Sequence, residues 1–176
     1  MRRVSFLVLL TVSLAALGQA GDMARSGSWG IQSAIGVSSA TGPGAATIGV
    51  KFFVSREVAI RVEAGVTSIS PPGGSTATGY AVGAGFEYHF APVGGVSPYL
   101  GVQGGYGGSS VSGGGNTPSV FGARAVWGGE YFFSSNFSWA GEIGFGFSSY
   151  KPASGSSTNT FGTTGTAAFI LSWYMN

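Results

Sequence analysis

One alternating stretch decides the fold, the nine residues VAIRVEAGV at positions 58–66. In an extended strand, successive side chains point to opposite sides. One side of this stretch therefore carries only aliphatic residues, whereas the other side carries Arg61 and Glu63 between Ala59 and Gly65. Strict alternation of this kind predicts a β-strand with one apolar face and one charged face.

The same separation of apolar and charged side chains recurs along the chain. Eight ionisable residues fall inside alternating stretches, and each lies opposite a row of aliphatic or aromatic side chains: Lys51, Arg61, Glu63, Glu87, His89, Arg124, Glu130 and Glu142. The segregation is therefore a property of most of the chain.

Turn-forming residues divide the chain into eight such stretches. Gly, Ser, Pro and Asn gather between them, as they do in turns. The predicted strands are 28–38, 46–54, 58–69, 78–90, 97–108, 119–133, 137–150 and 159–174. The connections at 55–57 and 134–136 are short, that at 91–96 is intermediate, and those at 39–45, 70–77, 109–118 and 151–158 are longer. This alternation is typical of outer-membrane barrels, whose short turns face the periplasm.

Composition favours a membrane barrel over a soluble one. Only 8% of the residues are charged and 44% are hydrophobic, whereas a soluble domain carries about 25% charged residues. A soluble β-sandwich or lipocalin-like barrel would turn its charged face to water, and eight charges are too few to cover that surface. A Lys or Arg facing lipid at mid-membrane costs about 2–4 kcal/mol. The predicted fold class is therefore all-β, an eight-stranded antiparallel up-and-down transmembrane β-barrel.

The first twenty residues have the pattern of a secretory signal peptide. Arg2 and Arg3 precede an apolar run that ends with small residues at Gly18 and Ala20, which is the expected order of charged, apolar and cleavage regions. The alternative is an uncleaved anchor helix, but the run is shorter than the about 20 residues that span a bilayer. We expect a cleaved signal peptide at 1–20, a short periplasmic segment at 21–27 and the barrel at 28–176.

Charge and cysteine content exclude several classes of site. Removal of Arg2 and Arg3 with the signal peptide reduces the eight Lys and Arg residues to six, which equals the six Asp and Glu residues. Nucleic acid is not an expected partner, because its binding needs a basic patch. The chain has no Cys, so disulfides and thiolate metal sites are excluded. We expect no metal site and no cofactor.

The charged faces of eight strands would meet inside the barrel. Opposite charges there should pair, because an unpaired buried charge is costly, and a barrel of eight strands is just wide enough to be filled by its own side chains. We therefore predict that the eight ionisable residues form an ionic network that plugs the half of the barrel next to the short turns, with Arg124 placed higher. Because an even number of strands returns both ends of the chain to the same side, we expect the N- and C-termini to be periplasmic.

The other half of the interior is lined by small or weakly polar residues: Gly79, Ala81, Gly83, Gly101, Gly105, Gly144, Gly146, Thr164 and Thr166. Two interpretations stay open at this stage. The residues could surround a water-filled pit that opens outward, or they could serve only to permit strong strand twist.

Aromatic residues concentrate near the predicted strand ends. Eight fall near the short turns and fit an interfacial girdle: Trp29, Phe52, Tyr88, Phe90, Tyr131, Phe133, Trp139 and Trp173. Five fit a second girdle at the opposite end: Tyr80, Tyr106, Phe121, Phe147 and Tyr150. Ordinary aromatic usage in strands would explain their number but not their position.

Three stretches resemble the OmpA/OmpX-like outer-membrane β-barrel family. They are SPYLGVQGGY at 97–106, GEYFFSSNFSW at 129–139 and FFVSREVAIRVE at 52–63. The resemblance implies a small eight-stranded barrel without a periplasmic domain, surrounded by outer-membrane lipid and inserted by the barrel-assembly machinery. That machinery reads a terminal aromatic residue in the family, whereas this chain ends in Trp173, Tyr174, Met175 and Asn176.

Three functions are compatible with such a barrel. The favoured one is non-enzymatic, namely envelope structure or contact with an unidentified surface ligand. The second is a small channel for ions or hydrophobic molecules. The third is an enzyme that would use Glu87 and His89 as a dyad. The third is least favoured, because these residues sit at the short-turn end and a catalytic pair must first have the right geometry.

Overall fold

The computed structural model describes residues 27–36, 46–69, 76–111, 117–163 and 167–175. The predicted signal peptide at 1–20 and residues 21–26 of the predicted periplasmic segment lie outside the described residues. Within the described ranges there are nine strands: β1 (Trp29–Gly36), β2 (Ala46–Phe53), β3 (Val58–Ile69), β4 (Ala77–His89), β5 (Val96–Val111), β6 (Ser119–Ser134), β7 (Phe137–Lys151), β8 (Thr158–Gly162) and β9 (Ala167–Met175). No helix in these ranges is long and apolar enough to cross a membrane.

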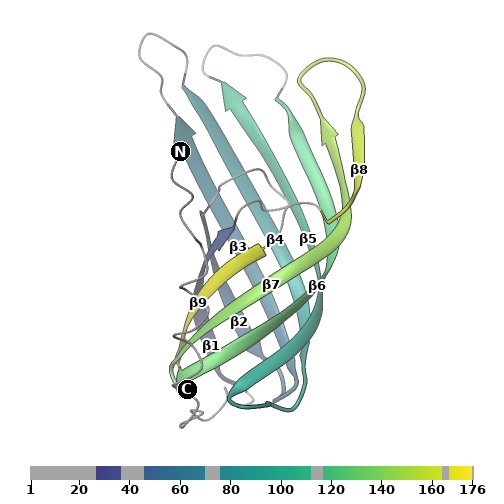
Figure 1. Cartoon of the computed structure of the whole chain (residues 1–176). Coiled ribbons are helices and arrows are strands. Elements are labelled where there is room, and N and C mark those ends of the chain that lie inside the picture. Colours follow the sequence, from purple (N-terminus) through teal and green to yellow (C-terminus); the bar gives the residue numbers. More distant parts are fainter. Residues whose placement is uncertain (1–26, 37–45, 70–75, 112–116, 164–166, 176) are drawn as a thin grey trace, which may run out of the picture.

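The strands form one closed antiparallel barrel (Figure 1). Each strand from β1 to β7 pairs with the next, and β9 pairs with both β7 and β1. The closing seam runs from Trp29 opposite Met175 to Gly36 opposite Ala168. Because β8 and β9 both continue alongside β7, they are two segments of one eighth strand. The predicted fold class, an all-β eight-stranded antiparallel barrel, is confirmed.

The eighth strand differs from its prediction as one continuous strand at 159–174. β8 ends with Gly162 opposite Gly146, and continuation of that register would place residue 165 opposite Ile143. Ile143 faces Ala167 instead, so the eighth strand accommodates two extra residues there, as in a β-bulge. Gly162 has a φ of 153°, a conformation that glycine adopts more readily than other residues. Hydrophobic alternation does not reveal such an insertion in a stretch of Gly and Thr.

The strands are of unequal length, and the barrel is taller on one side. β1 and β2 have 8 residues each, whereas β5 and β6 have 16. The long strands β3 to β7 rise past the seam between β1 and β9 (Figure 1). The short connections at 54–57, 90–95 and 135–136 lie together with the end of β9 at the opposite end of the barrel. The predicted contrast between short and long connections is therefore present.

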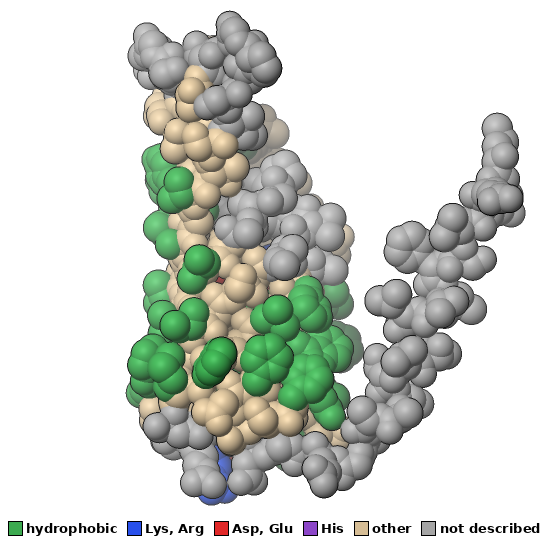
Figure 2. Space-filling view, turned by 90° about the vertical axis from the view of Figure 1, so that its left-hand side faces the viewer, with side chains coloured by type: hydrophobic (Ala, Val, Ile, Leu, Met, Phe, Trp, Pro, Cys, Tyr) green, Lys and Arg blue, Asp and Glu red, His purple; other side chains and the backbone are tan. Residues whose placement is uncertain are grey.

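Apolar side chains cover the outside of the barrel. Outward residues such as Val62 on β3 and Trp127 on β6 are 55% and 61% exposed, and a band of hydrophobic side chains surrounds the lower part of the visible face (Figure 2). Of the ionisable residues in the described strands, the eight predicted to face inward do so, with Lys51, Arg61, Glu87, His89, Glu130 and Glu142 fully buried. The exposed ionisable residues Arg56, Glu57 and Lys151 belong to strand ends and turns.

Candidate functional site

The buried charges come from five strands and meet in the lower half of the barrel. Alternation points them inward from β2 (Lys51), β3 (Arg61), β4 (Glu87 and His89), β6 (Arg124 and Glu130) and β7 (Glu142), while strand pairing sets their height. Lys51 lies directly opposite Arg61, for example. Seven of the eight predicted residues form one connected network, and Glu63 on β3 lies beside it.

Lys51 is the centre of the lower part of this network. Its Nζ lies 2.6 Å from Glu87 Oε2 and 2.8 Å from Glu130 Oε2, with the side chains of all three residues at most 2% exposed. The same nitrogen lies 5.1 Å from the ring centre of Phe53 and 5.3 Å from that of Tyr99. One ammonium group therefore bridges two carboxylates and lies between two aromatic rings.

Arg61 connects this lower part to the upper one. Its guanidinium makes two hydrogen bonds to the carboxylate of Glu142, at 3.1 and 3.2 Å, and Nη1 also lies 3.1 Å from Glu87 Oε1. Glu142 in turn accepts a hydrogen bond from Arg124 at 3.0 Å. The planar guanidinium suits such a bidentate contact. Arg61 therefore links Glu87, which also pairs with Lys51, to Glu142, which also pairs with Arg124.

His89 is enclosed within the network. Its Nε2 lies 3.2 Å from Glu87 Oε2, and its Nδ1 lies 3.0 Å from the hydroxyl of Ser97. The ring packs between Phe53 and Tyr99, with ring centres 5.1 and 5.0 Å away. The Glu87–His89 pair considered as a catalytic dyad is thus buried, with Glu87 0% and His89 1% exposed.

Glu63 stands apart from the ion pairs. Its carboxylate accepts a hydrogen bond from Thr47 at 3.3 Å, and no Lys, Arg or His side chain of the described ranges lies within 4.0 Å of it. An internal space of about 10 Å³ separates it from Gln32 on β1 and Arg61, enough for about one water molecule.

Two buried tyrosines that the sequence analysis did not single out complete the site. The hydroxyl of Tyr174 donates to Glu130 Oε1 at 2.7 Å, and that of Tyr99 donates to Glu142 Oε2 at 3.0 Å. Each ring lies against a glycine directly opposite it in the neighbouring strand, Gly30 for Tyr174 and Gly128 for Tyr99. The alternation of the sequence predicts that both tyrosines face inward, but it does not predict which glycines lie opposite them, because that depends on the register between strands.

Some small interior residues make room for the charged side chains. A Cβ atom added to Gly83 would come within 3.0 Å of Glu63 Oε1, and one added to Gly144 within 3.1 Å of Arg124 Cδ. At these positions small size serves packing of the ionic network. Thr164 and Thr166, which were also assigned to the upper interior, lie outside the described residues.

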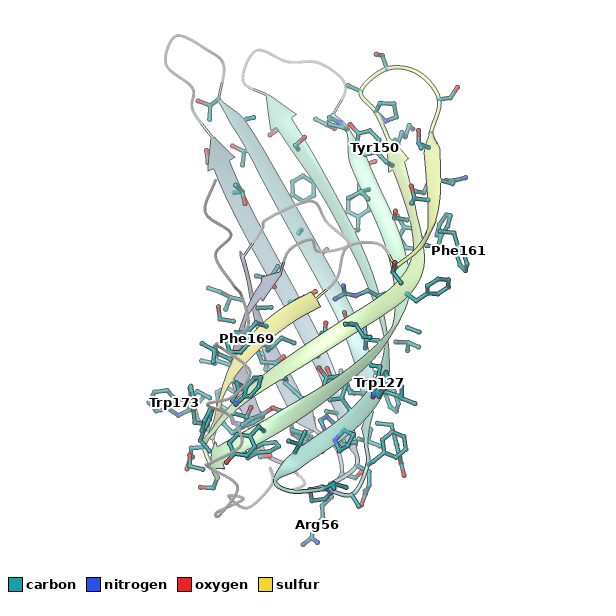
Figure 3. The ribbon with its side chains drawn as sticks, in the orientation of Figure 1. Arg56, Trp127, Tyr150, Phe161, Phe169 and Trp173 are labelled. Atoms are coloured by element: carbon teal, nitrogen blue, oxygen red, sulfur yellow. The ribbon has the colours of Figure 1, made fainter. Side chains whose placement is uncertain are left out.

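The eight aromatics of the predicted lower girdle all alternate with inward residues and face outward near the short turns. Neighbouring rings touch: Tyr88 packs edge-on against Phe90 at 5.3 Å, and Tyr131 against Phe133 at 5.1 Å. Trp173 on β9 points away from the barrel (Figure 3). At the other end Tyr80 and Tyr106 lie 6.3 Å apart, and both are about half exposed.

In the described ranges, no three His, Cys, Asp or Glu side chains are arranged to hold a metal ion.

Comparison with known proteins gave matches among solved structures only. No family model matches the sequence, and no curated protein matches it. The chain is similar to Neisserial surface protein A (NspA), with 18% identity over 84% of this chain and 92% of that chain and a TM-score of 0.46. It is also similar to Ail, the attachment invasion locus protein of Yersinia pestis, with 13% identity over 85% of this chain and 95% of that chain and a TM-score of 0.38.

Proposed function

We propose that the chain is an integral outer-membrane barrel whose interior is closed by its ionic network, and that it serves envelope structure or surface contact without catalysis. The observation that carries this proposal is that the two faces of the barrel are reversed relative to a soluble barrel: apolar side chains lie outside and buried charges lie inside. In water this arrangement would expose most of the hydrophobic residues, whereas in lipid it removes every strand charge from the costly side.

The height of the apolar band supports a membrane location. On β6, Phe121 near one end and Tyr131 near the other are outward aromatics separated by ten residues. A rise of about 3.3 Å per residue and a tilt near 40° convert this separation to about 25 Å. The same calculation for Tyr80 and Tyr88 on β4 gives about 20 Å. Outer-membrane barrels have an apolar band about 25 Å tall between two aromatic girdles.

The filled interior supports a closed barrel. Lys51, Glu87 and Glu130 fill the lower interior, and Arg61 and Glu142 fill the space above them, each at most 4% exposed. Paired charges at this density bind one another in place of passing ions. The upper ends of the long strands carry uncharged hydroxyl side chains, such as Ser109 and Ser110 on β5 and Ser148 on β7, and these are the part of the barrel offered for surface contact.

The test begins with the chain lacking residues 1–20, refolded into phospholipid vesicles. We expect a heat-modifiable shift in gel mobility and burial of the barrel in lipid. The folded protein is then added to a planar bilayer, where we expect no conductance steps. Failure to insert would contradict the membrane location, and stable unit steps would contradict the closed interior and favour a channel.

A second experiment separates the two non-enzymatic roles. The described loop between β7 and β8, residues 152–157, is exchanged for a Gly-Ser sequence of equal length in cells that produce the protein. Loss of cell contact with unchanged resistance to detergent would favour a surface role. Unchanged contact, combined with detergent sensitivity on deletion of the whole protein, would favour a structural role.

A further inference from the structure

The outer wall of the barrel contains a groove of about 510 Å³ between β5, β6 and β7. Its lining includes Pro98, Trp127, Gly129, Gly141 and Ile143, and Trp127 points outward beside it (Figure 3). We refer to it as the Gly129/Gly141 groove.

Strand pairing explains why the groove exists. Gly129 on β6 lies directly opposite Gly141 on β7. The next outward pair on one side is Trp127 with Ile143, and the next on the other side is Tyr131 with Trp139. One pair without side chains therefore lies between two pairs of large ones. The Val96 side chain comes close to Gly129, so the open space lies over Gly141.

The chain itself does not need a glycine at position 141. A Cβ atom added to Gly141 would have no atom within 4 Å, and Gly141 does not have a positive φ. Gly128 on the inner face is different, because a Cβ there would overlap the ring of Tyr99. Glycine weakens a strand and often marks a site where another group approaches closely. At Gly141 that other group must come from outside the barrel.

The chemistry of the groove selects an uncharged, apolar occupant. Trp127 and Ile143 are 61% and 57% exposed, and they form apolar walls around glycine backbone. The nearest carboxylate, that of Glu142, points to the interior, where Arg61 and Arg124 hold it. The groove is also continuous with the apolar band, one residue pair from the aromatic Tyr131–Trp139 pair at the short-turn end.

We propose that an acyl chain of a membrane lipid occupies the Gly129/Gly141 groove, with the part of the chain near the ester beside the Tyr131–Trp139 pair and the middle of the chain beside Trp127. The inference rests on the proposed membrane location. A flexible hydrocarbon chain would restore the dispersion contacts that the missing side chains leave unmade. The lipid belongs to the leaflet at the short-turn end, because the groove adjoins the girdle at that end.

The test uses Trp127 as a reporter. In a barrel with Trp29→Phe, Trp139→Phe and Trp173→Phe, Trp127 is the remaining tryptophan of the four. This protein is refolded in dioleoylphosphatidylcholine vesicles that contain phosphatidylcholine brominated near the middle of its acyl chains, which quenches nearby tryptophan. We expect strong quenching of Trp127, and we expect Gly141→Leu to reduce it because the leucine fills the groove.

Gly104→Leu is the matched control. Gly104 is an exposed, outward glycine on β5 whose added Cβ would meet only Gly122 O at 3.7 Å, and it does not line the groove. We expect this variant to quench like the parent. Native mass spectrometry after mild detergent extraction should find one retained phospholipid on the parent and on Gly104→Leu, and none on Gly141→Leu. Heat-modifiable mobility confirms that each variant has folded.

Three results would overturn the proposal. Equal quenching in the parent and Gly141→Leu would mean that no chain occupies the groove. A dimer in the parent that Gly141→Leu abolishes would mean that a second copy occupies it. If Trp127 is not quenched, a barrel that retains only Trp173 is tested with phosphatidylcholine brominated near the ester. No quenching of Trp173 would mean that the proposed membrane location is wrong as well, whereas quenching of Trp173 would leave that location intact and reject only the groove.

Discussion

Lys51 is the residue whose removal tests the ionic network most directly. It is 1% exposed, and it lies between two carboxylates, 2.6 Å from Glu87 and 2.8 Å from Glu130. Lys51→Met keeps the length of the side chain and most of its contact with the rings of Phe53 and Tyr99, but it removes the charge. Any loss of stability then reports mainly on the ion pairs.

The magnitude follows from what each acid retains. Glu87 keeps Arg61 at 3.1 Å and His89 at 3.2 Å. Among the described residues, Glu130 keeps only the hydroxyl donors of Ser138 and Tyr174 at hydrogen-bond distance, because His89 is 4.0 Å away. Removal of one partner from a buried ion pair costs about 3–5 kcal/mol, and since Glu87 remains paired we expect the lower end, about 3 kcal/mol.

The second change identifies the acid that is left unpaired. In the Lys51→Met protein, Glu130→Gln removes the orphaned charge and keeps an oxygen that accepts from the same hydroxyls. We expect the double variant to be more stable than the sum of the two single changes predicts, by about 1–3 kcal/mol. Val50→Met is the control, because Val50 is the neighbouring outward residue and surface substitutions change stability by about 0.5 kcal/mol or less.

The assay is equilibrium urea unfolding in phospholipid vesicles, followed by tryptophan fluorescence and by gel mobility, with linear extrapolation to zero urea. Conditions must first be shown to be reversible for the parent. If Lys51→Met costs no more than Val50→Met, or if the two changes at Lys51 and Glu130 are additive, the buried ion pairs are not what stabilises this end of the barrel.

Three further predictions use the same assay. Val62→Arg places a cation on the outer face within the apolar band and should lower the unfolding free energy by about 2–4 kcal/mol. Ser68→Arg, higher on the same face of β3, should lower it by only about 0–1 kcal/mol. Equal losses for the two variants would contradict the assigned height of the band. Gly128→Ala forces the Tyr99 ring from its place and should cost about 1–3 kcal/mol, a loss that the added change Tyr99→Leu should partly relieve. Tyr174→Phe removes a donor to a buried carboxylate and should cost about 1.5–3 kcal/mol, more than Tyr99→Phe, because the acid that Tyr99 serves keeps two arginines.

Strand positions could be predicted closely because the two faces of each strand differ so strongly. The stretch at 58–69 was predicted with the bounds of β3, and 137–150 differs from β7 by a single residue. Each charge fixed the parity of its strand, since in the proposed membrane location only one parity keeps it from lipid. Where charges are missing, as between Gly162 and Ala167, nothing in the sequence marked the break in the eighth strand.

The inward set of charges could also be predicted, but their partners could not. Parity states which side a residue faces, whereas pairing depends on the height of each residue, and height depends on the register between strands that are distant in sequence. Arg61 and Glu142 meet across the interior from β3 and β7, strands that do not pair with each other. The opposition of Tyr99 to Gly128 depends on register in the same way.

These charges specify the arrangement of the barrel more than they add to its stability. A well-packed apolar interior of the same volume is often as stable as a buried ion pair, and apolar side chains would tolerate a strand shifted by one residue. A shift of β3 by one residue would turn Arg61 and Glu63 to the outer face of the barrel. In the proposed membrane location this would cost about 2–4 kcal/mol for the arginine alone, and it would leave Glu142 and Glu87 without Arg61. Each inward charge therefore penalises the wrong register of its own strand. Because the charges on β2, β3, β4, β6 and β7 also require one another as partners, correct register of one strand favours correct register of the others.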